Sequence, residues 1–203
     1  MEMSPEDRDR ISSTIRAAEA RTTGEIVCVL AEQSSDSQAL PVLLAALAAL
    51  ALPWGLIAFT TLSVVSILSL QAVTFVVVGL LLSLPSARVA LIPRQARRAM
   101  AFRVATEQFL TRSVSRTRDR TGVLIFVSLA EHYARIIADD GIAARVPQSH
   151  WQGAVDALTA RSREGRMADG FVAAIEMCAA VLAEHFPSAD GGPNELPDRI
   201  YLI

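Results

Sequence analysis

Three carboxylates are the residues best suited to chemistry in this sequence. Asp139 and Asp140 stand side by side before Gly141, and Glu25 opens an apolar run much earlier in the chain. Carboxylate oxygens are the ligands that calcium and magnesium prefer, and with such a metal they can act on phosphate esters. We therefore predict a metal site at Glu25, Asp139 and Asp140, if the fold brings them together. Since aspartate and glycine are also ordinary turn residues, the alternative is a solvated acidic rim.

The other reactive side chains show no spacing typical of a catalytic site. His132, His150 and His185 are not arranged as metal ligands, and the sequence has no P-loop, GxGxxG, GxSxG or HExxH motif. Cys28 and Cys178 lie far apart, each within an apolar run, which predicts buried free thiols. The sequence thus predicts no organic cofactor and, at most, a calcium or magnesium ion.

Composition narrows the choice of partners. Of 203 residues, 19 are basic and 21 acidic, and all the basic residues are arginine. A net charge of −2 gives no reason to expect nucleic acid as a partner. The hydrophobic fraction of 52% is high for a soluble protein, which favours association with a lipid bilayer.

The middle of the chain has no charged residue between Asp36 and Arg88. A helix needs roughly 20 apolar residues to cross the hydrocarbon core of a bilayer, so this run predicts two crossings joined by a short turn. We place the spans near Leu40–Phe59 and Leu62–Leu84, with the turn at Phe59–Ser63. The alternative is a buried hairpin in the core of a soluble domain, but such a hairpin would show a polar face.

Arginines before the first span and after the second predict the orientation. Positively charged flanks of a span favour the cytoplasmic side. We therefore expect the chain in the inner (plasma) membrane of the cell, with both termini in the cytoplasm. The charged N-terminal residues 1–13 lack the apolar stretch of a secretory signal.

The flanking segments predict one α/β domain interrupted by the hairpin. Helix-then-strand patterns occur twice, with strands near Thr23–Glu32 and Thr121–Ala130, which predicts parallel strands with helical connections. A third strand returns antiparallel and ends at Asp139, making the sheet mixed. This order brings Glu25 and the aspartate pair to one edge. The expected parts are residues 1–36 and 88–187 for the domain, 37–87 for the hairpin and 188–203 for a C-terminal tail.

Helical patterns between and after these strands complete the domain. In the helix near Arg94–Ser113, Phe102, Ala105 and Phe109 are expected on one apolar stripe. Ser149 and Gln152 have the spacing of a capping box at the start of a later helix.

The order of elements resembles the TPM domain family, named after a thylakoid lumen protein, a photosystem II repair protein and a nematode receptor auxiliary subunit. The best-matching stretches are "VSLAEHYARII", Gly141, Pro147, "GRMADGFVAAIEMCAAVLAEHFP" and "NELPDRIYLI". The resemblance implies a three-layer α/β/α sandwich, and its members are linked to phosphatase activity and to support of membrane proteins. It carries no short catalytic signature.

Two functions follow as hypotheses. The first is a membrane-anchored accessory or assembly module that binds another membrane protein. The alternative is a cation-dependent phosphatase that uses the carboxylates at the sheet edge.

Overall fold

The computed structural model describes residues 3–34, 39–84, 92–188 and 193–203. The chain divides into two compact units, residues 1–34 with 98–203 and residues 35–97. The first unit is an α/β domain and the second contains a helical hairpin, α2 (Ala39–Phe59) and α3 (Val64–Ser83). Two segments far apart in sequence therefore fold as one domain around an insertion.

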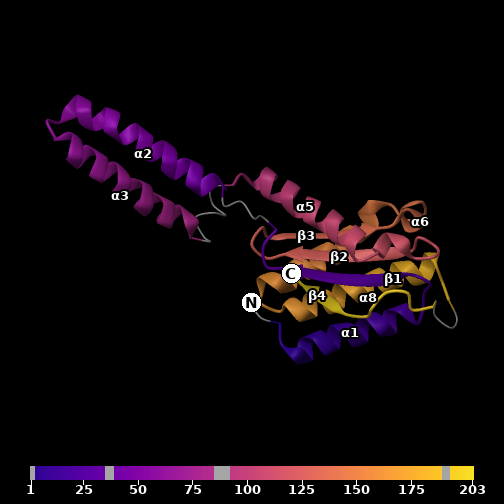
Figure 1. The fold of residues 1–203 in the computed structure, drawn as a ribbon. Helices are drawn as coiled ribbons and strands as arrows, with labels where there is room; N and C mark the ends of the chain where they lie inside the picture. Colours follow the sequence, from indigo (N-terminus) through magenta and orange to yellow (C-terminus); the bar gives the residue numbers. More distant parts are fainter. Residues whose placement is uncertain (1–2, 35–38, 85–91, 189–192) are drawn as a thin grey trace. The chain divides into compact units, whose positions relative to one another are not determined.

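A four-stranded mixed sheet forms the centre of the α/β domain (Figure 1). The strand order is β3-β2-β1-β4, and the strands are β1 (Glu25–Ala31), β2 (Gly122–Ser128), β3 (Tyr133–Ala138) and β4 (Ile200–Leu202). β1 runs parallel to β2 and to β4, whereas β3 returns antiparallel to β2. The predicted mixed sheet is confirmed, and β4 adds the end of the chain to it.

Helices cover both faces of the sheet, as the three-layer prediction requires. The helices of the domain are α1 (Pro5–Glu19), α5 (Arg94–Thr111), α6 (Asp140–Ala143), α7 (Gln152–Arg163) and α8 (Met167–His185), with 3-10 turns η1 (Val114–Arg116) and η2 (Gln148–Trp151). On one face α1, α7 and α8 pack against alternate strand residues such as Ile26 and Ile125. On the other face α5 packs against Val27 and Leu124.

β1 and β2 are buried along their whole length because both faces of the sheet are covered. Cys28 and Cys178 lie in the core between the sheet and α8 as buried free thiols, as predicted. Burial raises the pKa of the Cys178 thiol to about 12. A thiol that stays protonated is a weak nucleophile, so Cys178 serves packing.

Two local predictions are wrong. Phe102 lies outside the core, with 43% of its surface exposed, because Ala101 forms the buried stripe of α5 with Ala105 and Phe109. The capping box is also absent, because Ser149 lies inside η2 and α7 begins at Gln152 without a side-chain cap. The 3-10 turn η2 precedes α7, so the helix begins after Ser149 and not at it.

The second unit is apolar on all sides. α2 and α3 pack against each other, and both are long and apolar enough to cross a membrane. Trp54 in α2 is 78% exposed and Phe59 at its end is 90% exposed. Such exposure is not that of a soluble core hairpin, and it agrees with helices that face lipid.

Candidate functional site

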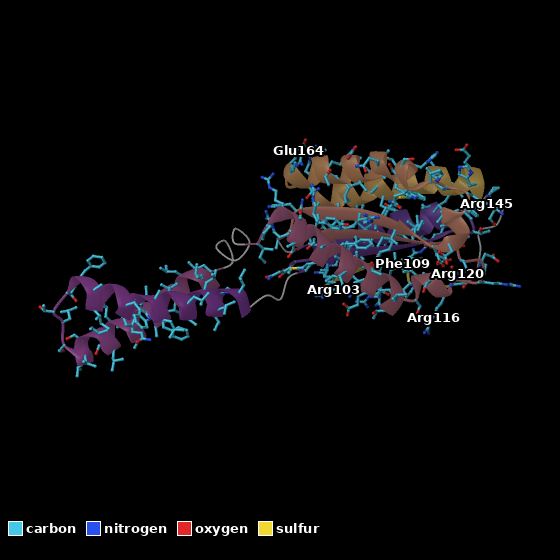
Figure 2. All side chains as sticks on the ribbon, turned by 90° about the horizontal axis from the view of Figure 1, so that it is seen from above. Arg103, Phe109, Arg116, Arg120, Arg145 and Glu164 are labelled. Atoms are coloured by element: carbon cyan, nitrogen blue, oxygen red, sulfur yellow. The ribbon has the colours of Figure 1, made fainter. Side chains whose placement is uncertain are left out.

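The sheet register places Glu25 and Asp139 at the same edge. Glu25, the first residue of β1, pairs with Gly122 of β2. The backbone N–H of Asp139 donates to the carbonyl of the same Gly122, at 2.9 Å. We call Glu25, Asp139 and Asp140 the acidic edge, which lies where the parallel strands begin. Figure 2 shows Arg116, Arg120 and Arg145 gathered at one end of the domain and Glu164 at the other.

The two buried carboxylates of the acidic edge, Glu25 and Asp139, each hold part of the fold. Glu25 is buried and accepts hydrogen bonds from the backbone N–H groups of Glu195 and Leu196, at 3.3 and 3.1 Å. Burial raises the pKa of Glu25, and these two hydrogen bonds act in the opposite direction. Glu25 thereby fastens the segment that leads into β4.

Arg120 binds both aspartates of the acidic edge. Its Nε lies 3.0 Å from Oδ2 of the buried Asp139, and its guanidinium donates to Asp140 at 2.7 Å. The other oxygen of Asp139 caps α6 by accepting from the N–H of Asp140, at 2.8 Å. Gly141 allows this arrangement, since a Cβ there would lie 2.6 Å from the carbonyl oxygens of Asp119 and Arg120.

The arrangement leaves the metal prediction untested. Within the described ranges, no three His, Cys, Asp or Glu side chains converge as a metal site. The calcium or magnesium site at Glu25, Asp139 and Asp140 therefore stays a prediction. A cation bound at the aspartates would be needed before the acidic edge could act on a phosphate ester, because Arg120 already pairs with both carboxylates.

A second pair of acids at this end was not found from the sequence. Glu19, the last residue of α1, accepts a hydrogen bond from the N–H of Ile26 at 2.7 Å and shares a side-chain hydrogen bond with Asp198. Burial raises the pKa of Glu19 to about 9, and the charges of Glu25 and Asp198 add to the effect. No local pattern marks this pair, since 178 residues of intervening sequence separate the two acids.

The protonated state of Glu19 predicts a specific pH dependence. Below pH 4.5, the ordinary value, Glu19 is protonated in folded and unfolded chains alike. Between pH 4.5 and about 9 only the unfolded chain releases the proton, so stability falls as pH rises and levels off above pH 9. Glu19→Gln mimics the protonated form, so it should stabilise the protein at pH 8 by roughly 1–3 kcal/mol and have little effect at pH 4.

Thermal unfolding of the detergent-solubilised full chain across this pH range checks the prediction. Glu176→Gln, at an exposed position of α8, is the matched control and should follow the wild type at every pH. Parallel pH profiles for wild type and Glu19→Gln would contradict a proton held at Glu19.

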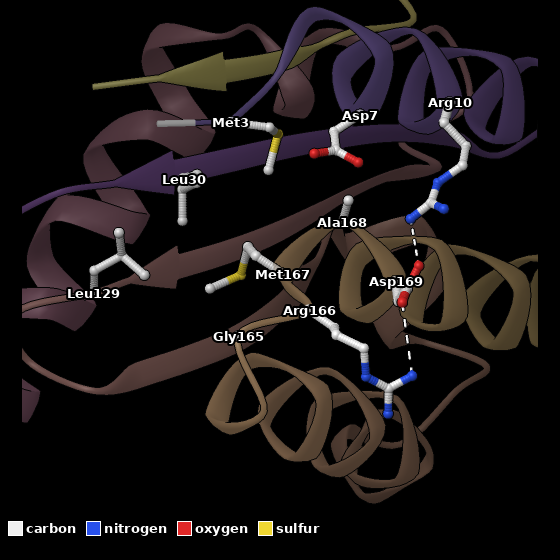
Figure 3. Close-up of a pocket in the computed structure, with 10 residues that line it drawn as sticks. All are labelled: Met3, Asp7, Arg10, Leu30, Leu129, Gly165, Arg166, Met167, Ala168 and Asp169. Atoms are coloured by element: carbon white, nitrogen blue, oxygen red, sulfur yellow. Dashed lines mark hydrogen bonds and ion pairs between the residues drawn. The ribbon is translucent and has the colours of Figure 1, made fainter. Parts of the chain in front are cut away.

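A pocket lies at the opposite end of the sheet, where the parallel strands finish (Figure 3). Its volume is about 280 Å³, and its floor is apolar, with Leu30 from the end of β1, Leu129 just after β2 and Met167 at the start of α8. β1 lies between β2 and β4, whose preceding helices cover opposite faces. Small ligands commonly bind outside the carboxyl ends of parallel strands at such a point.

Charged side chains form the rim of this pocket. Figure 3 shows Asp169 between two arginines, and it forms ion pairs with Arg10 from α1 and with Arg166, the latter at 3.7 Å. Arg166 also pairs with Glu164. The first turn of α8 has no side-chain cap, so its free N–H groups and the arginines could bind an anionic group. The sequence analysis missed this pocket, and the only local signal was Gly165-Arg166 before a long helix.

The fold defines the class of protein: an α/β/α sandwich with a helical hairpin inserted between its first two strands. Residues 86–181 match the family profile TPM_phosphatase, described as the TPM domain. This match confirms the resemblance to the TPM domain family.

A solved structure has the same fold. The NMR structure of the BA42 protein from the psychrophilic bacterium Bizionia argentinensis aligns with a TM-score of 0.62 and 21% identity, covering 100% of this chain and 97% of that chain. At this identity the likeness shows the fold alone. No curated protein matches the sequence.

Proposed function

We propose that the chain is a membrane-anchored TPM-like domain that acts as an accessory or assembly module for another membrane protein. The observation that carries the proposal is the insertion of an apolar hairpin into the connection between β1 and β2. A domain tethered through the connection between its two central strands stays at the bilayer surface, beside other membrane-associated proteins. An accessory role requires a domain that stays beside its membrane partner more than one that diffuses freely.

The proposal includes a topology. Arginines flank the hairpin on both sides, so both ends of the chain lie on the cytoplasmic side of the inner (plasma) membrane. Residues 60–63, between α2 and α3, lie on the opposite side. The domain then assembles on the cytoplasmic side from both of its segments.

Cysteine labelling in intact cells tests this topology. The native Cys28 and Cys178 are buried, so a membrane-impermeant maleimide should label only introduced thiols. We expect labelling of Thr61→Cys, which lies between α2 and α3, and protection of Ala17→Cys on the exposed face of α1 until the cells are opened. Labelling of Ala17→Cys in intact cells would contradict the proposed topology, because it would place the domain on the outer side of the membrane.

Replacing residues 39–84 by a flexible glycine–serine linker tests the anchor itself. We expect the full chain to stay in the membrane fraction after alkaline carbonate extraction and the linker variant to move to the soluble fraction. Release of the wild-type chain by carbonate would show that the hairpin does not span the bilayer.

The accessory role is tested by cross-linking in intact cells and purification in mild detergent. A membrane protein recovered in stoichiometric amount with the full chain supports the proposal. Recovery of the chain alone, with and without cross-linker, counts against it.

A phosphatase is the second candidate. It is favoured by the contact of Arg120 with two aspartates at the acidic edge and by the name of the matching family profile. The purified full chain, incubated with p-nitrophenyl phosphate with or without calcium or magnesium, distinguishes the candidates. Turnover that needs the cation and is lost in Asp140→Asn supports the enzyme, because Asp140 is exposed and its change should leave the fold intact.

A further inference from the structure

β3 is an edge strand with an open side. It pairs with β2 along one side, and no described strand pairs with it on the other. In an antiparallel ladder, residues alternate between pairs that exchange hydrogen bonds and pairs that do not. Because Asp139 bonds to Gly122, the N–H and C=O groups of Ala134, Ile136 and Ala138 point away from β2. Gln148 confirms this direction, since its side-chain amide donates to the carbonyl of Ile136 at 3.1 Å.

The open side of β3 lines a groove of about 610 Å³ between α5 and α7. We call it the β3 groove. Arg98 and Phe102 come from α5, Val155 and Asp156 come from α7, and Ala134 belongs to the strand itself. Ala134 is partly exposed and lines the groove, on the side to which its N–H and C=O point. In the described part of the chain, no hydrogen bond joins Ala134 to a residue outside the sheet.

The β3 groove carries positive charge. Arg98, Arg135 and Arg163 line it, against the single acid Asp156. Across the described segments none of these three arginines forms an ion pair. The guanidinium of Arg135 lies over the ring of Phe102, 4.7 Å from its centre. This stacking orients Arg135 and leaves the half-exposed Phe102 as an apolar contact within a basic surface.

An open strand edge and unpaired arginines together specify an occupant. Exposed edge strands bind extended peptides through backbone hydrogen bonds, and side-chain pockets beside the strand select the sequence. Unpaired arginines favour acidic side chains. A lipid headgroup would satisfy the arginines, but it would leave the outward N–H and C=O of Ala134 without partners. The observations therefore favour a peptide over a membrane surface.

We propose that the β3 groove binds an extended acidic segment of the partner protein as an added strand beside β3. The inference rests on the proposed accessory function and names the surface that performs it. The N–H and C=O of Ala134 bond to the segment's backbone. Ile136 is fully buried, so the added strand pairs at Ala134. Arg98, Arg135 and Arg163 pair with its carboxylates, and Phe102 contacts an apolar residue between them.

Binding of synthetic peptides to the full chain in detergent tests the proposal by fluorescence anisotropy. The probe is a fluorescein-labelled peptide of alternating glutamate and valine. We expect it to bind, and the Arg98→Glu/Arg163→Glu variant to bind it at least about tenfold more weakly. Both arginines are exposed, so the variant should fold. Arg103→Glu, an exposed change on α5 outside the groove, is the matched control and should bind as the wild type does.

Two further probes separate strand addition from charge alone. The same peptide with N-methyl groups on alternate amides keeps its charge but loses its donors, so we expect no binding. A lysine–valine peptide should not bind. No binding of the glutamate–valine peptide, or equal binding of its N-methylated form, overturns the proposal. Loss of binding to phosphatidylserine vesicles in Arg98→Glu/Arg163→Glu, with peptide binding unchanged, overturns it in favour of a lipid surface.

Purification from cells distinguishes failure of this inference from failure of the accessory role. If the wild-type chain and Arg98→Glu/Arg163→Glu recover the same membrane partner equally, the accessory role holds and the groove is wrong. Loss of the partner in this variant but not in Arg103→Glu supports the groove. Absence of any partner for the wild type removes the accessory role itself.

Discussion

Phe171→Ala should lower the midpoint of thermal unfolding by roughly 10–15 °C, through a loss of about 3–5 kcal/mol. Phe171 is fully buried in the core between α8 and the sheet. Removing its ring loses the free energy of its transfer from water and leaves a cavity that a rigid sheet cannot close. The measurement is circular dichroism of the full chain in detergent during heating.

Leu110→Ala is the control for this substitution. Leu110 lies on α5 with 59% of its surface exposed, so its change should cost less than about 1 kcal/mol. An equal loss of stability in both variants would mean that the core between α8 and the sheet is not packed as described.

Gly122→Ala should have the second largest effect, a loss of about 2–3 kcal/mol or more. A Cβ at Gly122 would overlap the backbone carbonyl oxygen and the side chain of Val114 in η1. Relief requires η1 or the start of β2 to move, and the start of β2 holds both Glu25 and Asp139 in place through Gly122. The substitution should therefore also loosen the acidic edge.

Gly153→Ala is the matched glycine change. Its Cβ would meet only the terminal methyl of Met177, at 3.1 Å, which can move aside. Because alanine favours helix over glycine by roughly 0.5–1 kcal/mol, this variant in α7 should keep or slightly raise the unfolding temperature. Thermal unfolding of the two variants side by side checks both expectations, and a Gly122→Ala protein as stable as Gly153→Ala would contradict the close approach of η1.

Much of the architecture could be predicted because it depends on local periodicity. The uncharged run from residue 37 to residue 87 marks the hairpin, since it is long enough for two helices of about 20 apolar residues joined by a short turn. Continuous apolar runs at β1 and β2 mark strands covered on both faces. Local signals did not define every helix start, because the 3-10 turn η2 contains Ser149, where a cap was expected.

The candidate site could be predicted only in part, for the same reason. That Glu25 and Asp139 meet at one edge follows from strand direction, which the sequence indicates. The groups that these carboxylates bind do not follow from the sequence. Arg120, Glu195 and Leu196 reach them through loops whose paths depend on the whole domain.

Sequence by itself determined the hairpin, the order of helices and strands, and the edge that gathers the acids, because each follows from hydrophobic period or strand direction. Tertiary structure decided three further features: the pairing of β4 with β1, the protonated Glu19 beside Asp198, and the open side of β3. β4 has only three residues, too few to show a periodicity, and only the fold brings it beside β1. The pKa of Glu19 and the free groups of Ala134 likewise depend on which distant segments cover them, and no local pattern records that.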